Sequence, residues 1–249
     1  MMKRLLQLLA AFTSALIATH SAAQPSEWRI TPYGWVAGFD GTLGAPGDNA
    51  GLVGRVDVDT DSLSDNIRLG GAMLHASWRG GRWTAFGDWT YANVKTDTPT
   101  PFATLYSGVD VKLKGNIVEA YGGYDLLGGG NSHLDVFGGV RYYNLKLELG
   151  LREGLLPGVL VGEDSNWVDG VVGIRWDMRF HRNWEAFASA DVGGGGSDLS
   201  WQLFGGVGYR FGWGSIVGGW RHLHIDYEKR GFKLDAAISG PFIGASFLF

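Results

Sequence analysis

The chain has no cysteine, little proline and, beyond its first residues, no long hydrophobic run. Its 249 residues include no Cys and seven Pro. The lack of cysteine excludes disulfides, thiol catalysis and cysteine metal sites. After residue 23 no apolar run approaches the roughly 20 residues that a membrane-spanning helix needs. A membrane location for the mature chain would therefore require a closed β-barrel, because only helices and closed barrels satisfy every backbone polar group in lipid.

A secretory signal peptide is predicted at residues 1–23. Lys3 and Arg4 form its charged region, and Leu5 to Ile17 form its apolar core. That core is too short and wrongly flanked to be a spanning helix, and Ser21-Ala22-Ala23 supplies a small-residue cleavage site. No Cys follows the core, so a lipoprotein anchor is excluded. We expect export of the chain with removal of this segment.

The predicted mature chain, residues 24–249, is acidic and rich in glycine. The full chain has a net charge of −4, and the signal peptide holds two basic and no acidic residues, so the mature charge is −6. This charge argues against a nucleic-acid partner, which would favour a basic surface. The 41 Gly disfavour helix interiors, and the length suits one domain. We therefore expect a single all-β barrel domain over this range.

Ten segments with strand-like alternation predict an antiparallel, transmembrane up-and-down β-barrel. They are residues 28–39, 69–79, 82–94, 111–126, 134–149, 167–180, 184–192, 199–211, 215–227 and 232–249. An even number puts both chain ends on one side of the membrane. Short connections at 80–81, 127–133, 181–183 and 212–214 are predicted to be periplasmic, and the long loop at 40–68 extracellular. Eight or twelve strands stay open, since Pro32 and Gly240-Pro241 indicate bulges or bends at which the alternation slips.

The last predicted strand ends on an aromatic residue. Ile243, Ala245, Phe247 and Phe249 fall on one face, because successive side chains of a strand point to opposite faces. We expect this strand to close the sheet by pairing with the first strand near Trp28. We also expect the barrel-assembly machinery to bind this strand. The other expected partner is outer-membrane lipid, both phospholipid and lipopolysaccharide.

Alternation separates an apolar face from a polar one, and the aromatic residues sort by height. In segment 167–180 the outward side chains are apolar and the inward set includes Asp169, Arg175 and Asp177. Two aromatic girdles are predicted: Trp28, Trp83, Trp184, Phe211 and Phe249 at the periplasmic ends, and Trp89, Tyr91, Tyr142 and Trp201 toward the other interface. A soluble sandwich core or a sugar-binding face is the alternative, but its aromatic residues would not sort by distance from the turns.

A cluster of charged and polar side chains is predicted inside the barrel near mid-height. Its members are Asp88, Glu119, Arg141, Arg175, Asp191, Gln202 and Arg221. Charges buried in a narrow barrel are costly unless they are paired, so we expect a salt-bridged plug. The alternative is the constriction of a narrow pore. A ten-stranded barrel is only slightly wider than the eight-stranded kind that side chains fill.

The histidines give little evidence of chemistry. His75 is predicted to face the lumen, and His133 and His181 are expected to be solvated in turns. His222 and His224 share the outward face with Asp226. Two histidines at this spacing could hold a metal, but we expect no metal there.

An acidic stretch in the first loop resembles the start of a calcium loop. It contains Asp57, Asp59, Asp61 and Asp65, but Ser62 and Arg68 replace the Gly and Glu that such a loop needs. No G-x-S-x-G elbow occurs. We therefore expect no catalytic residue, no metal and no cofactor, and predict that the chain is not an enzyme. Weak binding of a divalent ion by the acidic loop is the alternative for that segment. The alternative is a hydrolase whose active site lies in extracellular loops, using Asp61, Asp65 and His224.

A series of motifs covers most of the mature chain in order. They are Ile30-Thr31-Pro32-Tyr33, residues 139–145, Trp167-Val168-Asp169, Gly173-Ile174-Arg175, residues 191–194, 197–202, 206–211 and 240–249. In these motifs the chain resembles a Gram-negative outer-membrane β-barrel family, OmpA-like or porin-like in the broad sense. The resemblance implies an integral outer-membrane barrel and brings no substrate or catalytic residues. We expect a structural barrel or a narrow porin-like channel for small solutes or ions.

Overall fold

Twelve β-strands form the described part of the computed structural model, which comprises residues 26–44, 53–58, 70–98, 106–153, 159–229 and 232–249. The strands are β1 (Glu27–Trp35), β2 (Gly38–Gly44), β3 (Val53–Val58), β4 (Gly70–Gly80), β5 (Trp83–Thr98), β6 (Tyr106–Asp125), β7 (Ser132–Glu153), β8 (Val159–Phe180), β9 (Trp184–Gly194), β10 (Leu199–Phe211), β11 (Gly214–Lys229) and β12 (Phe232–Leu248). No helix within these ranges is long and apolar enough to cross a membrane. The predicted signal peptide lies outside the described residues.

The strands close into one antiparallel barrel. Each strand from β4 to β12 pairs with the next, and β1 pairs with both β4 and β12. Strand β2 pairs with β12 in the same register as β1, so it continues β1 along that strand. Strand β3 pairs with the other edge of β2, just as β4 pairs with the other edge of β1. The twelve segments therefore make a wall of ten strands, which confirms the predicted up-and-down barrel. The predicted closure is also confirmed, since Phe249 and Trp28 exchange two backbone hydrogen bonds of 3.0 and 3.1 Å.

Two predictions about the first and last strands are wrong. The register of β11 with β12 runs without a shift through Gly240 and Pro241, and that of β1 with β4 runs through Pro32, so neither place holds a bulge. The predicted loop at 40–68 contains the β2–β3 hairpin. Glycines at positions 38, 41 and 44 interrupt the apolar alternation of β2 and hide it in the sequence.

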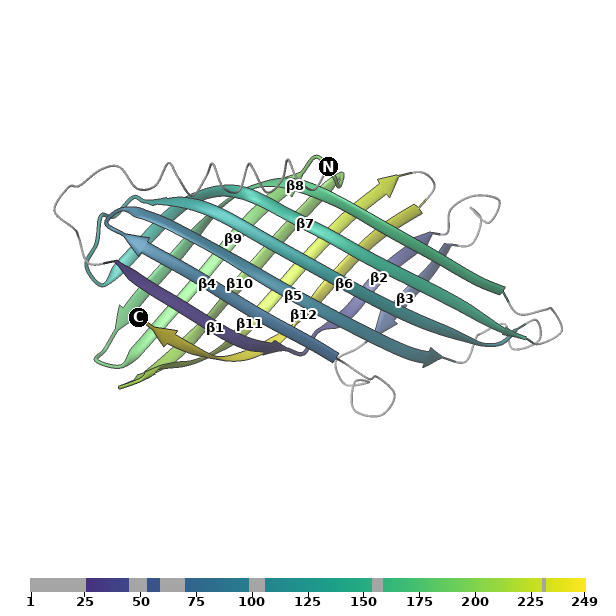
Figure 1. Cartoon of the computed structure of the whole chain (residues 1–249), viewed down its shortest axis with the longest axis horizontal. Helices are drawn as coiled ribbons and strands as arrows, with labels where there is room; N and C mark the ends of the chain where they lie inside the picture. Colours follow the sequence, from purple (N-terminus) through teal and green to yellow (C-terminus); the bar gives the residue numbers. More distant parts are fainter. Residues whose placement is uncertain (1–25, 45–52, 59–69, 99–105, 154–158, 230–231) are drawn as a thin grey trace, which may run out of the picture.

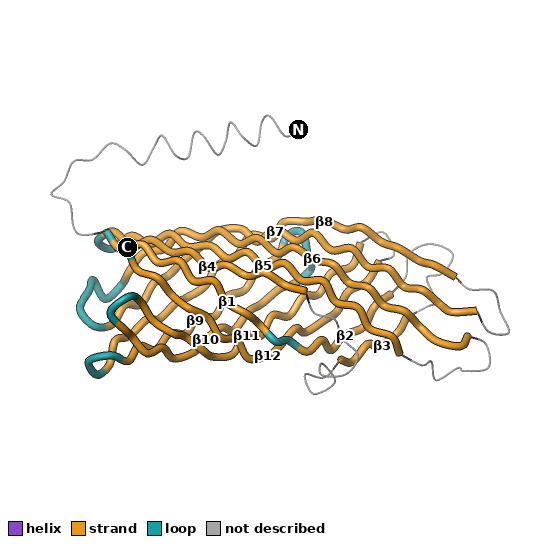
Figure 2. Tube along the Cα trace, turned by 60° about the horizontal axis from the view of Figure 1, so that its bottom comes forward, coloured by secondary structure: helices purple, strands orange, loops and turns teal. Residues whose placement is uncertain are grey.

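The short connections gather at one end of the barrel, where Figure 2 shows most of the teal turns. We call this the turn end. It holds residues 81–82, 126–131, 181–183 and 212–213 together with Phe249, and the opposite end is the loop end. β6, β7 and β8 extend farthest toward the loop end (Figure 1). They continue well beyond their predicted bounds. The bounds were predicted from apolar alternation, whereas backbone pairing continues where the outward side chains are no longer apolar.

The outward and inward faces have opposite chemistry. Large apolar residues of the outward face are exposed, among them Val140, Val172, Ile174, Leu203, Val207 and Ile243. The turn-end girdle of Trp28, Trp83, Trp184, Phe211 and Phe249 is exposed as well. Charged side chains point inward and are buried, including Asp135, Asp169, Arg141 and Arg221. An apolar belt with aromatic edges around a polar interior is the surface expected of a membrane barrel.

Packing inside the barrel predicts a steric cost at Gly173. A Cβ atom there would lie 2.5 Å from the Ala190 carbonyl oxygen and 2.5 Å from Phe137 Cζ. We expect Gly173→Ala to lower the free energy of unfolding by about 1–3 kcal/mol, because overpacking forces neighbours to move. Urea unfolding in detergent micelles measures this. The control is Gly122→Ala, since nothing lies within 4 Å of that Cβ position; equal losses in both variants would contradict the packing described here.

Candidate functional site

The interior of the barrel is filled by side chains in three successive layers. A central network of charged and polar groups lies between a cluster of ion pairs near the turn end and a layer of aromatic and aliphatic side chains toward the loop end. The layers come from strands all around the wall, so they connect segments far apart in the sequence. This filled interior is the candidate functional site.

Arg221 of β11 is at the centre of the network. Its Nη1 lies 3.0 Å from Asp88 Oδ1, its Nη2 donates to Glu119 Oε1 at 3.2 Å, and its Nε donates to Gln202 Oε1 at 2.9 Å. Nη1 also donates to the hydroxyls of Tyr33 and Thr90. The guanidinium carbon lies 4.9 Å from the Trp35 ring centroid. Arg221 is 1% exposed, and its charge is paired with those of Asp88 and Glu119.

Arg141 of β7 completes the network. Its Nε donates to Glu119 Oε1 at 2.7 Å, and its Nη2 donates to Asp191 Oδ1 at 2.9 Å and to the Tyr121 hydroxyl at 3.1 Å. Arg141 is 0% exposed. The same Glu119 oxygen therefore accepts from both arginines. Gln202 Nε2 lies 3.4 Å from Asp191 Oδ2 and closes the ring of contacts.

Strand register explains why the network needs a cation from a distant strand. Asp88, Glu119 and Arg141 are direct cross-strand neighbours on β5, β6 and β7. Like charges directly opposite each other destabilise a sheet, and Asp88 faces Glu119 in this way. Arg221 reaches both carboxylates from β11 and offsets that repulsion. The His75 ring lies 3.6 Å from Asp88, so a protonated His75 would balance the remaining negative charge.

The structure brings together six of the seven side chains predicted to form the lumen cluster. They are Asp88, Glu119, Arg141, Asp191, Gln202 and Arg221. Arg175 does not join them. It donates to Asp177 at 2.9 Å and lies 5.0 Å from the Phe86 ring centroid, closer to the turn end. Strand tilt is the reason, because residues counted equally from their strand ends do not lie at equal height in a tilted barrel.

Three neutral groups of the network were missed by sequence reasoning. Tyr33, Thr90 and Tyr121 each supply a hydroxyl to one of the two arginines. They carry no charge, and the cluster was predicted by looking for inward-facing residues of opposite charge that could neutralise one another. Their inward position follows from the same alternation that places Asp88 and Glu119 in the lumen, and this was the available signal.

A second set of ion pairs, the turn-end cluster, is built around Arg79. Its guanidinium contacts Asp135 at 2.7 Å and lies 3.7 Å from both Asp125 and Asp177. His133 Nδ1 lies 2.7 Å from Asp125 Oδ2, so the prediction that His133 is solvated is wrong. His133 is the second residue of β7 and faces a buried carboxylate across the hairpin.

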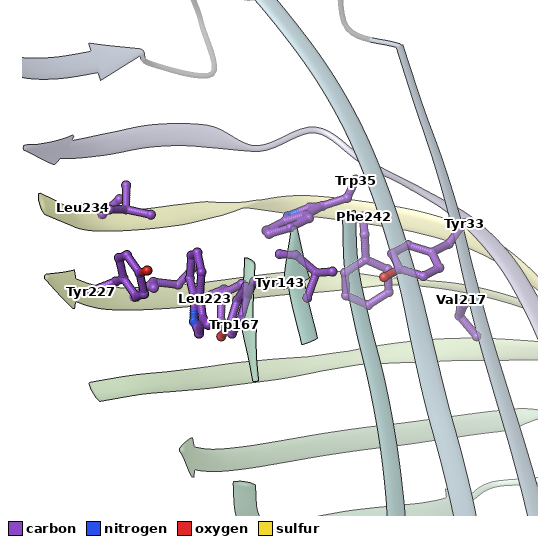
Figure 3. Packing of buried hydrophobic residues seen from close by; sticks show 12 residues of the cluster. Tyr33, Trp35, Tyr143, Trp167, Val217, Leu223, Tyr227, Leu234 and Phe242 are labelled. Carbon is purple, nitrogen blue, oxygen red and sulfur yellow. The ribbon is translucent and has the colours of Figure 1, made fainter. Parts of the chain in front are cut away.

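Aromatic and aliphatic side chains form a buried layer inside the barrel, toward the loop end (Figure 3). Trp167 stacks between Tyr143 and Tyr227, with ring centroids 4.7 and 4.1 Å apart and interplanar angles of 20° and 23°. Leu223 and Leu234 pack against this stack, and all five side chains are buried. The layer covers the charged network with apolar groups on the loop side.

Two small cavities lie on the turn side of the aromatic layer in the described part of the interior. Each has a volume of about 80 Å³. One is lined by His75, Asp88 and Arg221 among others, and the second by Arg79 and Arg175 among others. Each volume suits several water molecules, since one water needs roughly 10–15 Å³. The two cavities share lining residues, among them Arg29, Phe86 and Arg175, so they adjoin each other inside the barrel.

Asp169 of β8 has a structural role that the sequence did not reveal. It is fully buried, and its carboxylate accepts from the Gly196 and Ser197 backbone N–H groups at 3.1 and 2.7 Å. The Ser197 and Ser200 hydroxyls donate to its other oxygen at 2.6 and 2.9 Å. These bonds fix the β9–β10 connection to the barrel wall.

The remaining residues considered for chemistry are dispersed. His181 is exposed in its turn, as predicted. His222 and His224 lie on the outward face beside Trp201, with ring centroids 4.6 and 5.8 Å from the indole. Asp57 belongs to β3, whereas Asp59, Asp61 and Asp65 lie outside the described residues. Within the ranges that the structure describes, no group of three or more His, Cys, Asp or Glu could hold a metal ion.

Removing the shared carboxylate tests the central network. We expect Glu119→Ala to lower the free energy of unfolding by about 3–5 kcal/mol, because two buried arginines lose a common partner. The matched control is Glu228→Ala, whose exposed pair with Lys233 at 3.3 Å should contribute less than about 1 kcal/mol. Urea unfolding in micelles compares the two variants. A loss at Glu119 no larger than that at Glu228 would show that the network is not formed.

Comparisons with known proteins agree with this architecture. No protein-family model and no curated protein sequence matches the chain. Among solved structures, the outer membrane protease OmpT from Escherichia coli is similar with a TM-score of 0.53 and 10% identity, over 93% of this chain and 100% of OmpT. The translocator domain of autotransporter NalP from Neisseria meningitidis is also similar, with a TM-score of 0.44 and 16% identity, over 99% of this chain and 95% of NalP. The closed ten-strand wall and the similarity to OmpT show that the chain has the fold of the outer-membrane β-barrels of Gram-negative bacteria.

Proposed function

We propose that the chain is an integral outer-membrane barrel whose interior is closed and whose role is structural. The turn end faces the periplasm, since short turns and both chain ends lie on that side in bacterial barrels. The exposed apolar belt between the aromatic girdles supports a location in lipid. The barrel has no catalytic role in this proposal, and its last strand carries the signal for assembly in the membrane.

The observation that carries the proposal is the sharing of Glu119 by two fully buried arginines. Arg141 and Arg221 are 0% and 1% exposed, and they extend from different strands to one carboxylate oxygen. A continuous pore would require these pairs to separate. Breaking a buried ion pair costs about 3–5 kcal/mol. The resting barrel is therefore expected to be closed to ions.

A narrow, gated ion pathway is the second candidate. Two cavities with charged linings lie on the turn side of the aromatic layer, one bordering Asp88 and Arg221 of the network. Side chains of both signs at a constriction are suited to tuning ion passage. In this alternative a change in the network and in the stack at Trp167 would join these cavities to the loop end.

Planar-bilayer conductance separates the two candidates. We expect no current steps from the refolded mature protein, and none from Arg221→Ala, because the aromatic layer still seals the lumen. The double variant Arg221→Ala, Trp167→Ala removes both layers and is expected to give small steps, which shows that an opened barrel can be detected. Heat-dependent gel mobility verifies folding of all three proteins.

Discrete steps from the wild type would contradict the closed barrel. If their size or ion preference changed in Arg221→Ala, the network would be the constriction of a pore. Silence from the wild type together with steps from the double variant supports closure by the two layers.

A further inference from the structure

The barrel wall has a gap in its strand pairing toward the loop end, between β8 and β11. The last row of paired residues that crosses β8, β9, β10 and β11 there consists of Val171, Gly193, Ser200 and Ile225. Directly beyond this row β9 and β10 turn back, whereas β8 and β11 continue toward the loop end. In the described part of the chain no strand joins β8 to β11 beyond the row, and we call this place the strand gap.

The β9–β10 connection bounds the strand gap on the turn side. Asp169 of β8 accepts hydrogen bonds from the Gly196 and Ser197 backbone N–H groups at 3.1 and 2.7 Å. On the other side, the Asp198 N–H donates to the Asp226 carbonyl oxygen of β11 at 2.9 Å. The connection is thus tied to both flanking strands. Beyond it, the described residues supply no backbone hydrogen bond between β8 and β11.

Two aromatic rings span the strand gap from inside the barrel. Trp167 of β8 and Tyr227 of β11 lie beyond the last complete row, and both side chains are buried. Their ring centroids are 4.1 Å apart with 23° between the ring planes, so the rings stack (Figure 3). Since β9 and β10 lie between β8 and β11, three strand spacings of about 4.8 Å, or at most about 14 Å, separate the two backbones. Two large rings can reach across this distance, and their stack replaces the missing strands as the contact between β8 and β11.

This stacked contact opens more easily than a strand pair. Turning either ring about its side-chain bonds breaks no backbone hydrogen bond. Trp167 Nε1 is also buried and meets no hydrogen-bond acceptor among the described residues. A buried donor without a partner is costly, and this cost disappears when the indole turns out to water. The stacked position of Trp167 therefore contains a group that favours opening.

We propose that Trp167 and Tyr227 form a lid over the strand gap, and that water reaches the loop side of the charged network when this lid opens. The proposal rests on the closed barrel proposed above and gives the place where its closure is reversible. Along the inward face of β11, Tyr227 is followed toward the turn end by Ile225, Leu223 and Arg221, all of them buried. Opening the lid therefore exposes Ile225 before it exposes the arginine.

Thiol labelling at position 225 tests the lid. The chain has no cysteine, so Ile225→Cys gives the refolded barrel a single thiol, whose reaction rate with a small water-soluble methanethiosulfonate reagent is measured in micelles. Adding Trp167→Ala or Tyr227→Ala is expected to raise this rate about tenfold, because either change removes one half of the stack. The matched control is Leu234→Ala, which should leave the rate unchanged. Leu234 is buried in the same layer but belongs to β12, which does not border the strand gap.

The outcomes separate the lid from the closed barrel. Equal acceleration by all three alanine variants would overturn the lid, because the layer would then act as a uniform plug. No acceleration by Trp167→Ala and Tyr227→Ala would overturn it as well. If Ile225→Cys alone reacted as fast as a thiol at the exposed position Glu228, the closed barrel itself would be wrong, and the lid with it. Heat-dependent gel mobility shows which variants are folded, and either of the two lid variants suffices for the test.

Discussion

The carboxylate of Glu119 is the interaction on which the interior depends. One of its oxygens accepts from Arg141 on the neighbouring strand and from Arg221 on β11. A barrel wall is held by backbone hydrogen bonds between adjacent strands, which do not connect opposite sides. This carboxylate does connect them, because β6 and β11 are separated by several strands in either direction. The hydrogen bonds to this shared oxygen connect opposite walls of the barrel across its interior.

The layers on either side follow from the same constraint. Charges in a narrow lumen must be paired or solvated. On the turn side, small cavities and the ion pairs of Arg79 meet this need. On the loop side, the buried stack around Trp167 puts apolar groups next to the ion pairs, and a lower local dielectric constant strengthens those pairs. The outward face needs no such arrangement, because its exposed side chains are apolar.

Much of the fold could be predicted from the sequence because a membrane barrel repeats one rule. Alternation determined which residues face inward, and the bounds of β10 at Leu199 and Phe211 agree with the prediction. Counting from the strand ends then identified most of the charged network. It misplaced Arg175, because strand tilt separates residues that counting treats as level. Neutral partners such as Tyr33 were missed because alternation shows that they face inward but does not show that they bind a charged group.

Other features were beyond sequence reasoning for physical reasons. The β2–β3 hairpin is short and rich in glycine, so its alternation is weak. The hydrogen bonds of His133 to Asp125 and of Asp169 to the β9–β10 connection depend on the conformation of the connecting turns. The alternation of apolar and polar residues does not determine that conformation. Register also places Trp176, Ala188, Gly205 and Trp220 in one outward row across four strands. That row exists only once the register of three strand pairs is known.

The exchange of the guanidinium Nε–H protons tests the central claim most directly. These protons of Arg141 and Arg221 are bonded to Glu119 and Gln202 in the interior of the barrel. In ¹⁵N-resolved NMR spectra of the micelle-bound barrel transferred to D₂O, we expect both signals to persist long after those of exposed arginines such as Arg82 have disappeared. Loss of both signals at the rate of exposed arginines would mean that water reaches the network freely, and it would contradict a closed barrel.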